Sequence, residues 1–204
     1  MIYGIDDFVD LLLVRKGIFA LVSWEHRPAM LALLTNLKRS VRRTERTIRT
    51  SLLSGENLVA EQFVVALHGQ LKSQHASATV LVLYDLETLL DGAGRILNGL
   101  REQLRCFRAV ILVLRENRRG DLFAACPDFM DWFGPIIYYA EALSRPFTPS
   151  DVRRAIRSFE AKHGMSSKDF SRKWESGQGT GIDDGWMWNE LLALYGDMKA
   201  RAQT

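Results

Sequence analysis

The sequence has few cysteines and no long hydrophobic run. Its 204 residues contain two cysteines, Cys106 and Cys126, and neither stands in a metal-binding spacing. This argues against a disulfide framework and is typical of a reduced cytosolic protein. No apolar stretch approaches the roughly 20 residues of a membrane span. The first ten residues, MIYGIDDFVD, carry acids where a signal peptide needs basic residues. We therefore expect a soluble cytoplasmic protein with no membrane partner.

The sequence also lacks a strong charge of either sign. The formal net charge is +3, with 47% hydrophobic and 25% charged residues. This composition is typical of a soluble globular protein, and the mild charge by itself gives no support to nucleic-acid binding.

A glycine-rich phosphate loop is missing as well. After an apolar run at residues 18–24, where such a loop would stand, the chain reads Glu25-His26-Arg27-Pro28. Phosphate-cradling loops need glycines, then a lysine and a hydroxyl residue, so that backbone N–H groups and the lysine converge on the phosphates. No serine lies in a G-x-S-x-G motif either, and neither cysteine has a base fixed near it. The sequence thus predicts neither nucleotide hydrolysis nor a catalytic triad.

What is present is organised around residues 78–88, ATVLVLYDLET. The apolar residues 80–84 predict a parallel strand buried on both faces, and Asp85 follows it directly. Ligands of open α/β sheets bind at the carboxyl ends of strands, where an acid can hold magnesium. One interpretation makes Asp85 a metal-holding carboxylate with Glu87 polarising water. The other interpretation, which the missing phosphate loop favours, is that Asp85 simply ends a buried strand and caps the next turn.

Helical and strand patterns alternate through the first 145 residues. Strands are expected at 18–24, 47–53, 80–84 and 109–114, and helices at 5–14, 29–41, 58–72 and 95–107. Residues 89–94 are expected to form a turn, and 136–139 either a further strand or the start of a helix. This order predicts an α/β three-layer sandwich with a mainly parallel sheet of about four to five strands.

A basic segment follows the second expected helix. On a helix, Lys38, Arg42, Arg46 and Arg49 would form one stripe. The functional interpretation is contact with phosphates or an acidic partner, and the structural one, which we favour, is a solvated helix end. No aromatic residue interleaves the segment, so nucleic-acid binding is expected to be weak or absent. The full set of basic residues is Lys38, Arg39, Arg42, Arg43, Arg46 and Arg49.

The clearest boundary lies at residues 145–150, RPFTPS, because two close prolines oppose both helix and sheet. We expect an α/β domain at 1–145 and a small all-α tail at 151–204, with Ser150 or Asp151 capping its first helix and Ser166-Ser167 its second. The tail is rich in large aromatic residues, which either anchor its core or contact a partner. The candidate partner-binding residues are Trp174, Trp186, Trp188 and Tyr195.

Part of the first domain resembles a module of large bacterial tetratricopeptide-repeat and NLR-like ATPase proteins, whose pattern is roughly LN-x-x-RE-x-L, an apolar strand, then APDF-x-x-W. The resemblance covers residues 18–132 and implies a P-loop-NTPase-like fold. Cys126 stands where that pattern has alanine. The matching residues are Leu97-Asn98, Arg101-Glu102, Leu104, the strand 110–114, Pro127-Asp128-Phe129 and Asp131-Trp132.

Residues 159–195 resemble short antitoxin-type proteins of prokaryotic toxin–antitoxin pairs, which act by holding a partner. The resemblance implies interaction and no active site. The matching residues are Phe159-Glu160, Lys162, Gly164-Met165-Ser166-Ser167, Phe170, Trp174, Gly177, Asp183-Asp184, Trp188 and Leu194-Tyr195.

Together these patterns predict a non-catalytic binding or regulatory protein of a prokaryotic cytosol, with another protein, such as a toxin or defence effector, as its partner. No cofactor and no metal are expected. One alternative is a nucleotide-sensing or hydrolysing enzyme that uses Asp85 and Glu87. A further alternative is a nucleic-acid-binding module that uses the basic segment.

Overall fold

The computed structural model describes residues 4–56, 58–86, 89–133, 136–144, 147–178 and 185–201, without the side chains of 90–94, 186 and 201. Backbone contacts divide the chain into two compact units, Met1–Pro146 and Phe147–Thr204. Within the described residues, no helix is both long and apolar enough to cross a membrane.

The first unit is built on a parallel sheet of five strands in the order β2-β3-β4-β1-β5. The three central strands are apolar almost throughout, which buries them on both faces. The sequence therefore predicted the fold class and the mainly parallel sheet correctly. The strands are β1 (Ile18–Trp24), β2 (Arg49–Ser54), β3 (Thr79–Tyr84), β4 (Ala109–Arg115) and β5 (Ile137–Tyr139).

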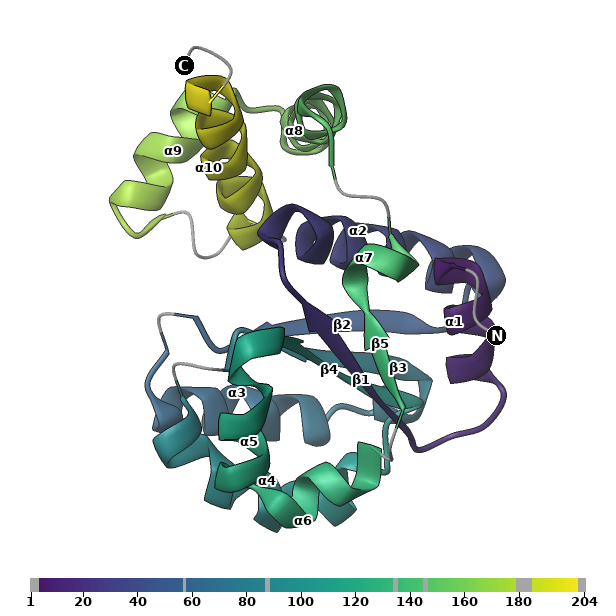
Figure 1. Ribbon diagram of the computed structural model, residues 1–204. Helices are drawn as coiled ribbons and strands as arrows, with labels where there is room; N and C mark the ends of the chain where they lie inside the picture. Colours follow the sequence, from purple (N-terminus) through teal and green to yellow (C-terminus); the bar gives the residue numbers. More distant parts are fainter. Residues whose placement is uncertain are drawn as a thin grey trace. The chain divides into compact units, whose positions relative to one another are not determined.

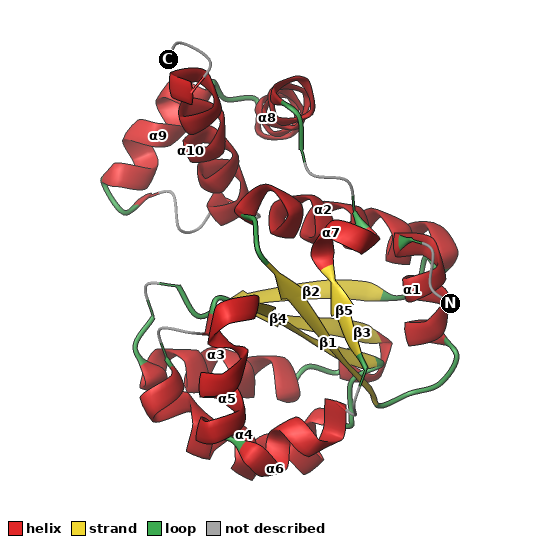
Figure 2. Cartoon of the chain, in the orientation of Figure 1, coloured by secondary structure: helices red, strands yellow, loops and turns green. Residues whose placement is uncertain are grey.

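Helices cover both faces of this sheet, which makes three layers (Figure 1). One layer holds α1 (Ile5–Leu13), α2 (Arg27–Thr44) and α7 (Ala140–Leu143), and α2 packs against both of the others. The other layer holds α3 (Ala60–Leu71), α4 (Leu90–Leu104), α5 (Arg119–Ala125) and α6 (Pro127–Met130). Figure 2 shows the strands lying between these two groups of helices. Short 3₁₀ turns in the described part of this unit are η1 (Ala76–Ala78), η3 (Glu116–Arg118) and η4 (Asp131–Phe133).

One expectation for this unit was wrong, and one that the sequence left open is decided by the structure. Residues 90–94 are not a turn, because α4 already begins at Leu90 and includes Gly92 and Gly94. The apolar periodicity of residues 96–104 extends the helix backward through these glycines, which a helix tolerates at a modest cost. Residues 136–139 resolve into the short strand β5, and the helix α7 begins only at Ala140.

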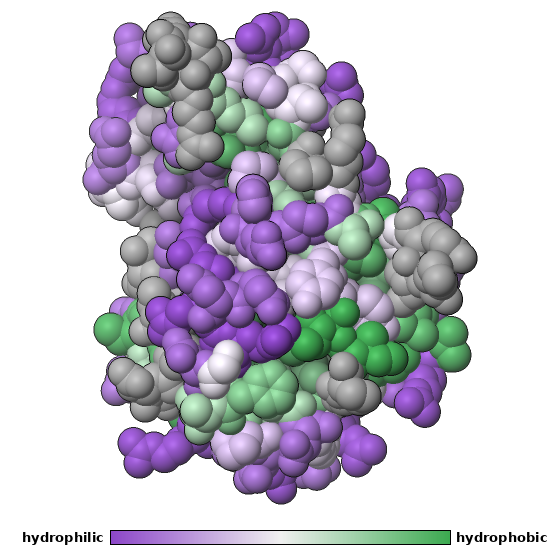
Figure 3. Space-filling view, viewed as in Figure 1, coloured by the Kyte–Doolittle hydropathy of each residue, from purple (hydrophilic) through white to green (hydrophobic). Residues whose placement is uncertain are grey.

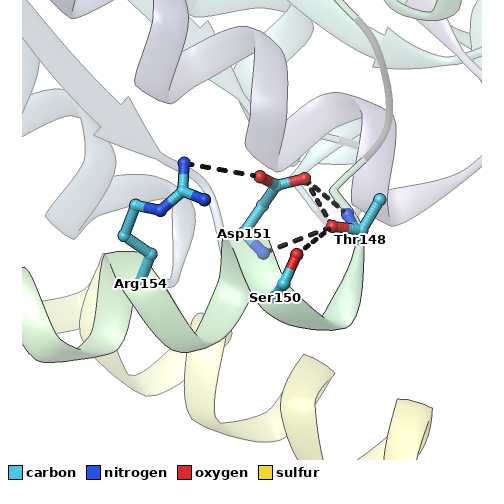
Figure 4. A network of polar contacts seen from close by, with 4 residues as sticks. All are labelled: Thr148, Ser150, Asp151 and Arg154. Atoms are coloured by element: carbon cyan, nitrogen blue, oxygen red, sulfur yellow. Dashed lines mark hydrogen bonds and ion pairs between the residues drawn. The ribbon is translucent and has the colours of Figure 1, made fainter.

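The described part of the second unit contains the helices α8 (Pro149–His163), α9 (Ser167–Glu175) and α10 (Gly185–Arg201). The cap of α8 is Thr148, not Ser150 or Asp151, and Pro149 takes the first helical position, where its missing N–H costs nothing. Thr148 Oγ1 accepts from Asp151 N at 3.3 Å, and Asp151 Oδ2 accepts from Thr148 N at 3.1 Å (Figure 4). Gly164 ends the helix in the left-handed conformation, and Ser166 caps α9 as predicted.

The core of the second unit is aromatic. Trp188 of α10 is fully buried and stacks on Phe170 of α9 with ring centroids 4.2 Å apart. Phe159 and His163 of α8 stack on the same indole at 5.9 Å and 5.8 Å. All three helices therefore meet at one tryptophan, which is the largest fully buried side chain among the described residues.

Candidate functional site

The loop between β1 and α2, where a phosphate loop would stand, is held by a carboxylate of the protein itself. The backbone N–H groups of Glu25 and His26 both donate to Glu141 Oε1, each at 3.0 Å. Glu141 lies on α7, directly after β5, and α7 packs against both α2 and β1. The two N–H groups that converge here are thus already satisfied by an internal anion.

The carboxyl ends of β1 and β4 lie next to this loop, at a position where ligands of open α/β sheets usually bind. β1 and β4 are adjacent, and the helix that follows β1 covers one face while those that follow β4 cover the other. Such a switch point opens a crevice at the carboxyl ends of the strands. Here Trp24 ends β1 in register with Arg115 of β4, and the Arg115 guanidinium lies 4.8 Å from the centre of the Trp24 ring. This cation–π pair covers the ends of both strands.

Asp85 follows β3 in an unusual backbone conformation. It is 9% exposed, and its φ of 52° is the only positive φ of a non-glycine residue in the described chain. Gly55, after β2, donates its N–H to Tyr84 O at 2.8 Å. A Cβ on Gly55 would stand 2.6 Å from Asp85 O, so only glycine fits this approach. The backbone around Asp85 is therefore fixed by close packing between the ends of β2 and β3.

Acids gather along this edge of the sheet. Each of the four connections that leave β1 to β4 contains one described acid: Glu25, Glu56, Asp85 and Glu116. Glu56 pairs with Arg27 at 3.1 Å, and Glu116 pairs with Arg119 at 2.7 Å. Figure 3 shows hydrophilic side chains covering this part of the surface, between α2 and α5. Glu87, the proposed companion of Asp85, lies outside the described residues.

This arrangement suits a cation better than a bare phosphate. The edge lacks the glycines and lysine of a phosphate loop, Pro28 removes one N–H from the first turn of α2, and Glu141 occupies the two converging N–H groups. Carboxylates repel an anion unless a cation comes with it, although Arg27 and Arg119 offset two of the four acids here. Among the described residues, no group of three or more His, Cys, Asp or Glu side chains is placed to hold a metal ion.

The basic segment does not form the single helical stripe that was expected. α2 ends at Thr44, so Arg46 lies in the connection to β2 and Arg49 is the first residue of that strand. Arg43 forms an ion pair with Asp6 of α1, and hydrogen bonds from Ser40 and Arg43 lower the pKa of that carboxyl. Lys38, Arg39 and Arg42 are exposed on the last turns of α2.

The tail aromatics divide into buried and accessible residues. Trp188 is a fully buried core residue of the second unit, which for this residue favours the interpretation as a core anchor over contact with a partner. Trp174 is half-buried beside Phe170, at 5.6 Å between ring centroids. Tyr195 is half-buried too, and its hydroxyl accepts from Arg153 Nε at 3.0 Å. The side chain of Trp186 lies outside the described part.

The cysteines are not placed for catalysis. Cys126 is fully buried, and burial raises the pKa of its thiol to about 11. Cys106 is exposed, and partial burial of its sulfur raises the pKa of its thiol. A thiol with a raised pKa is a poor nucleophile at neutral pH.

No protein-family model matches the chain, and no curated protein matches it either. Among solved structures, the Aeropyrum pernix ORC1 protein in complex with DNA matches with a TM-score of 0.49 and 10% identity, over 78% of this chain and 48% of that one. A DNA polymerase III gamma subunit-related protein from Thermotoga maritima matches with a TM-score of 0.47 and 14% identity, over 76% of this chain and 49% of that one. The chain thus spans about half of each. Neither match supports the antitoxin-like resemblance.

Sequence reasoning singled out Asp85 as a candidate, and it did not point to Glu141 or to the pair of Trp24 and Arg115. Glu141 lies 115 residues after His26 in the sequence, and no local pattern links the two. The one available signal was an acid directly after an apolar stretch at 136–140, the same signal that singled out Asp85.

Proposed function

We propose that the α/β unit senses a magnesium-bound nucleotide at the carboxyl edge of its sheet and does not hydrolyse it. The observation that carries the proposal is the position of Asp85. Its carboxyl group follows a central parallel strand, in a closely packed backbone next to the strands of the switch point. Nucleotide hydrolases of P-loop type hold their magnesium with an acid at such a strand end.

Two features argue for sensing without turnover. The β1–α2 loop offers no lysine to the phosphates, and its converging N–H groups are bound by Glu141. Phosphoryl transfer depends almost entirely on positioned charges around the phosphates, so their loss removes the chemistry while a magnesium-mediated contact can remain. We expect weak binding, because the nucleotide has to rely on the cation at an acidic edge.

Isothermal titration of the full chain with ATP and GTP, with magnesium and with excess EDTA, tests the proposal. We expect magnesium-dependent binding without phosphate release, lost in Asp85→Asn and kept in the matched control Glu102→Gln. Glu102 is an exposed acid on the last turn of α4, away from this edge. Circular dichroism should show both variants folded. Absence of binding at millimolar nucleotide, or equal binding by Asp85→Asn, contradicts the proposal.

Partner binding by the second unit is a second proposed function. Trp174 and Tyr195 favour it, because both keep part of their aromatic surface accessible on a unit whose core is already supplied by Trp188 and Phe170. Partly exposed aromatic side chains are frequent anchors of protein interfaces. The partner would be another protein, as the antitoxin-like resemblance implies.

A further inference from the structure

The four connections that lead into β1, β2, β3 and β4 are basic. They span residues 14–17, 45–48, 72–78 and 105–108, all within the described part of the chain, and Glu45 is the only acid among them. Arg49 adds a further cation as the first residue of β2. The cations of the connections are Arg15, Lys16, Arg46, Lys72, Arg105 and Arg108.

The parallel sheet brings these cations to one edge. The registers Arg49 with Thr79, Val80 with Ala109 and Ile18 with Ala109 place the starts of the four strands side by side. Gly17 N donates to Arg108 O at 3.0 Å, which joins two of the connections, and Arg108 N donates to Thr79 O, at the start of β3, at 2.9 Å. Three strand spacings of about 4.8 Å make this row roughly 14 Å wide. We call it the amino edge.

The charge of the amino edge is accessible. Every cation named above is exposed except Arg108, which is half-buried and donates to Leu13 O. The acids beside the edge are few: Glu45, which accepts from Thr47, Glu102, which lies 3.7 Å from Arg105, Asp10 on α1 and Asp131 before β5. The opposite edge carries Glu25, Glu56, Asp85 and Glu116, and arginines pair with two of these acids there, Arg27 with Glu56 and Arg119 with Glu116. Acids are therefore common at that edge and rare at the amino edge.

We propose that the amino edge binds the phosphodiester backbone of nucleic acid without reading its sequence. A row of roughly 14 Å laid along a duplex covers about four base pairs at the axial rise of 3.4 Å in B-form DNA. Most of these cations are arginines, whose planar guanidinium suits phosphate. The single helical stripe that the sequence suggested does not form. Two of its residues, Arg46 and Arg49, lie at the amino edge instead. The proposed site is independent of the nucleotide proposed at the opposite edge.

Fluorescence anisotropy with labelled single-stranded and duplex DNA of mixed sequence, at several salt concentrations, tests the proposal. The variant carries Arg46→Gln, Arg49→Gln and Arg105→Gln. The matched control carries Arg157→Gln, Lys168→Gln and Lys173→Gln, which remove the same charge from exposed positions of the second unit. Thermal melting checks that both variants stay folded.

For the wild type we expect a Kd on the order of micromolar at low salt, with log K falling linearly with log salt. Each lost phosphate contact reduces the slope of log K against log salt by about 0.7–0.9. The edge variant should therefore lose about 2 units of slope and bind DNA at least about tenfold more weakly. The control variant should bind like the wild type. An equal loss of DNA affinity in both variants would show that DNA is attracted by net charge alone, and it would overturn the proposed site at the amino edge. Competition by polyglutamate as strong as that by unlabelled DNA would assign the edge to an acidic protein instead.

Discussion

At the scale of single residues, the carboxyl edge depends on a glycine whose importance no motif reveals. Gly55 is the point where the backbone after β2 meets the backbone after β3. Because Gly55 has no side chain, Asp85 O and Leu89 Cδ1 can lie only 2.6 Å and 2.9 Å from the position that a Cβ would occupy. Asp85, in its left-handed conformation, cannot move away without changing the end of β3.

We therefore predict that Gly55→Ala destabilises the α/β unit by roughly 1–3 kcal/mol, the usual cost of inserting a methyl group into a packed region. Urea denaturation followed by circular dichroism measures this. Gly69→Ala is the matched control, because Gly69 lies in α3 with nothing within 4 Å of its Cβ position. Alanine there should be neutral or stabilising by up to about 1 kcal/mol. Equal stability of the two variants would show that the backbone at Gly55 yields freely.

At the scale of elements, the helices of the second unit begin and end at strong local signals. Thr148 and Asp151 satisfy each other's backbone N–H groups at the start of α8, and Arg154 lies 3.9 Å from the other oxygen of Asp151. At the end of α8, Glu160 accepts from Ser167 N and Oγ, which lowers the pKa of its carboxyl. These contacts fix where α8 and α9 begin.

We predict that Thr148→Ala destabilises the second unit by about 1 kcal/mol, because the N–H of Asp151 loses its acceptor. Thermal unfolding of the full chain, monitored at the far-ultraviolet helix signal, measures the effect. Ser158→Ala serves as the control, since Ser158 is exposed in the interior of α8, where alanine is the better helix former. A melting curve of Thr148→Ala that overlays the wild type would mean that the cap adds nothing.

At the scale of the whole molecule, the chain consists of two compact units, each with a core of its own. The first unit buries the apolar faces of its sheet under two layers of helices. The second buries Trp188 against Phe170 of α9 and Phe159 of α8. Units with separate cores can in general fold separately.

We predict that residues 1–146 alone fold with a cooperative transition close to that of the full chain, and that a partner captured by the full chain is lost with residues 147–204. Circular dichroism and affinity capture with mass spectrometry measure the two parts. Trp174→Ala in the full chain is the milder companion variant, which should weaken capture without lowering the melting temperature. Unfolding of the fragment 1–146 would instead make the second unit part of a single fold.

The sequence by itself determined the elements of this protein and much of their order. Continuous apolar runs located β1, β3 and β4, because a strand covered on both faces has no polar side to interrupt it. Helix periodicity and the alternation of elements gave the α/β class. The sequence alone also shows that residues 25–28 lack the glycines and the lysine of a phosphate loop, because a motif depends only on which residues follow one another.

Only the tertiary structure decided what meets at the edges of the sheet. The contact of Glu141 with the β1–α2 loop and the pairing of Trp24 with Arg115 join residues far apart in sequence, so no local pattern encodes them. Packing against α8 and α9 makes Trp188 a core residue, which its sequence neighbours did not indicate. The cations of four connections became one surface because parallel strands all begin at the same edge, which is a property of the strand order and of no single segment.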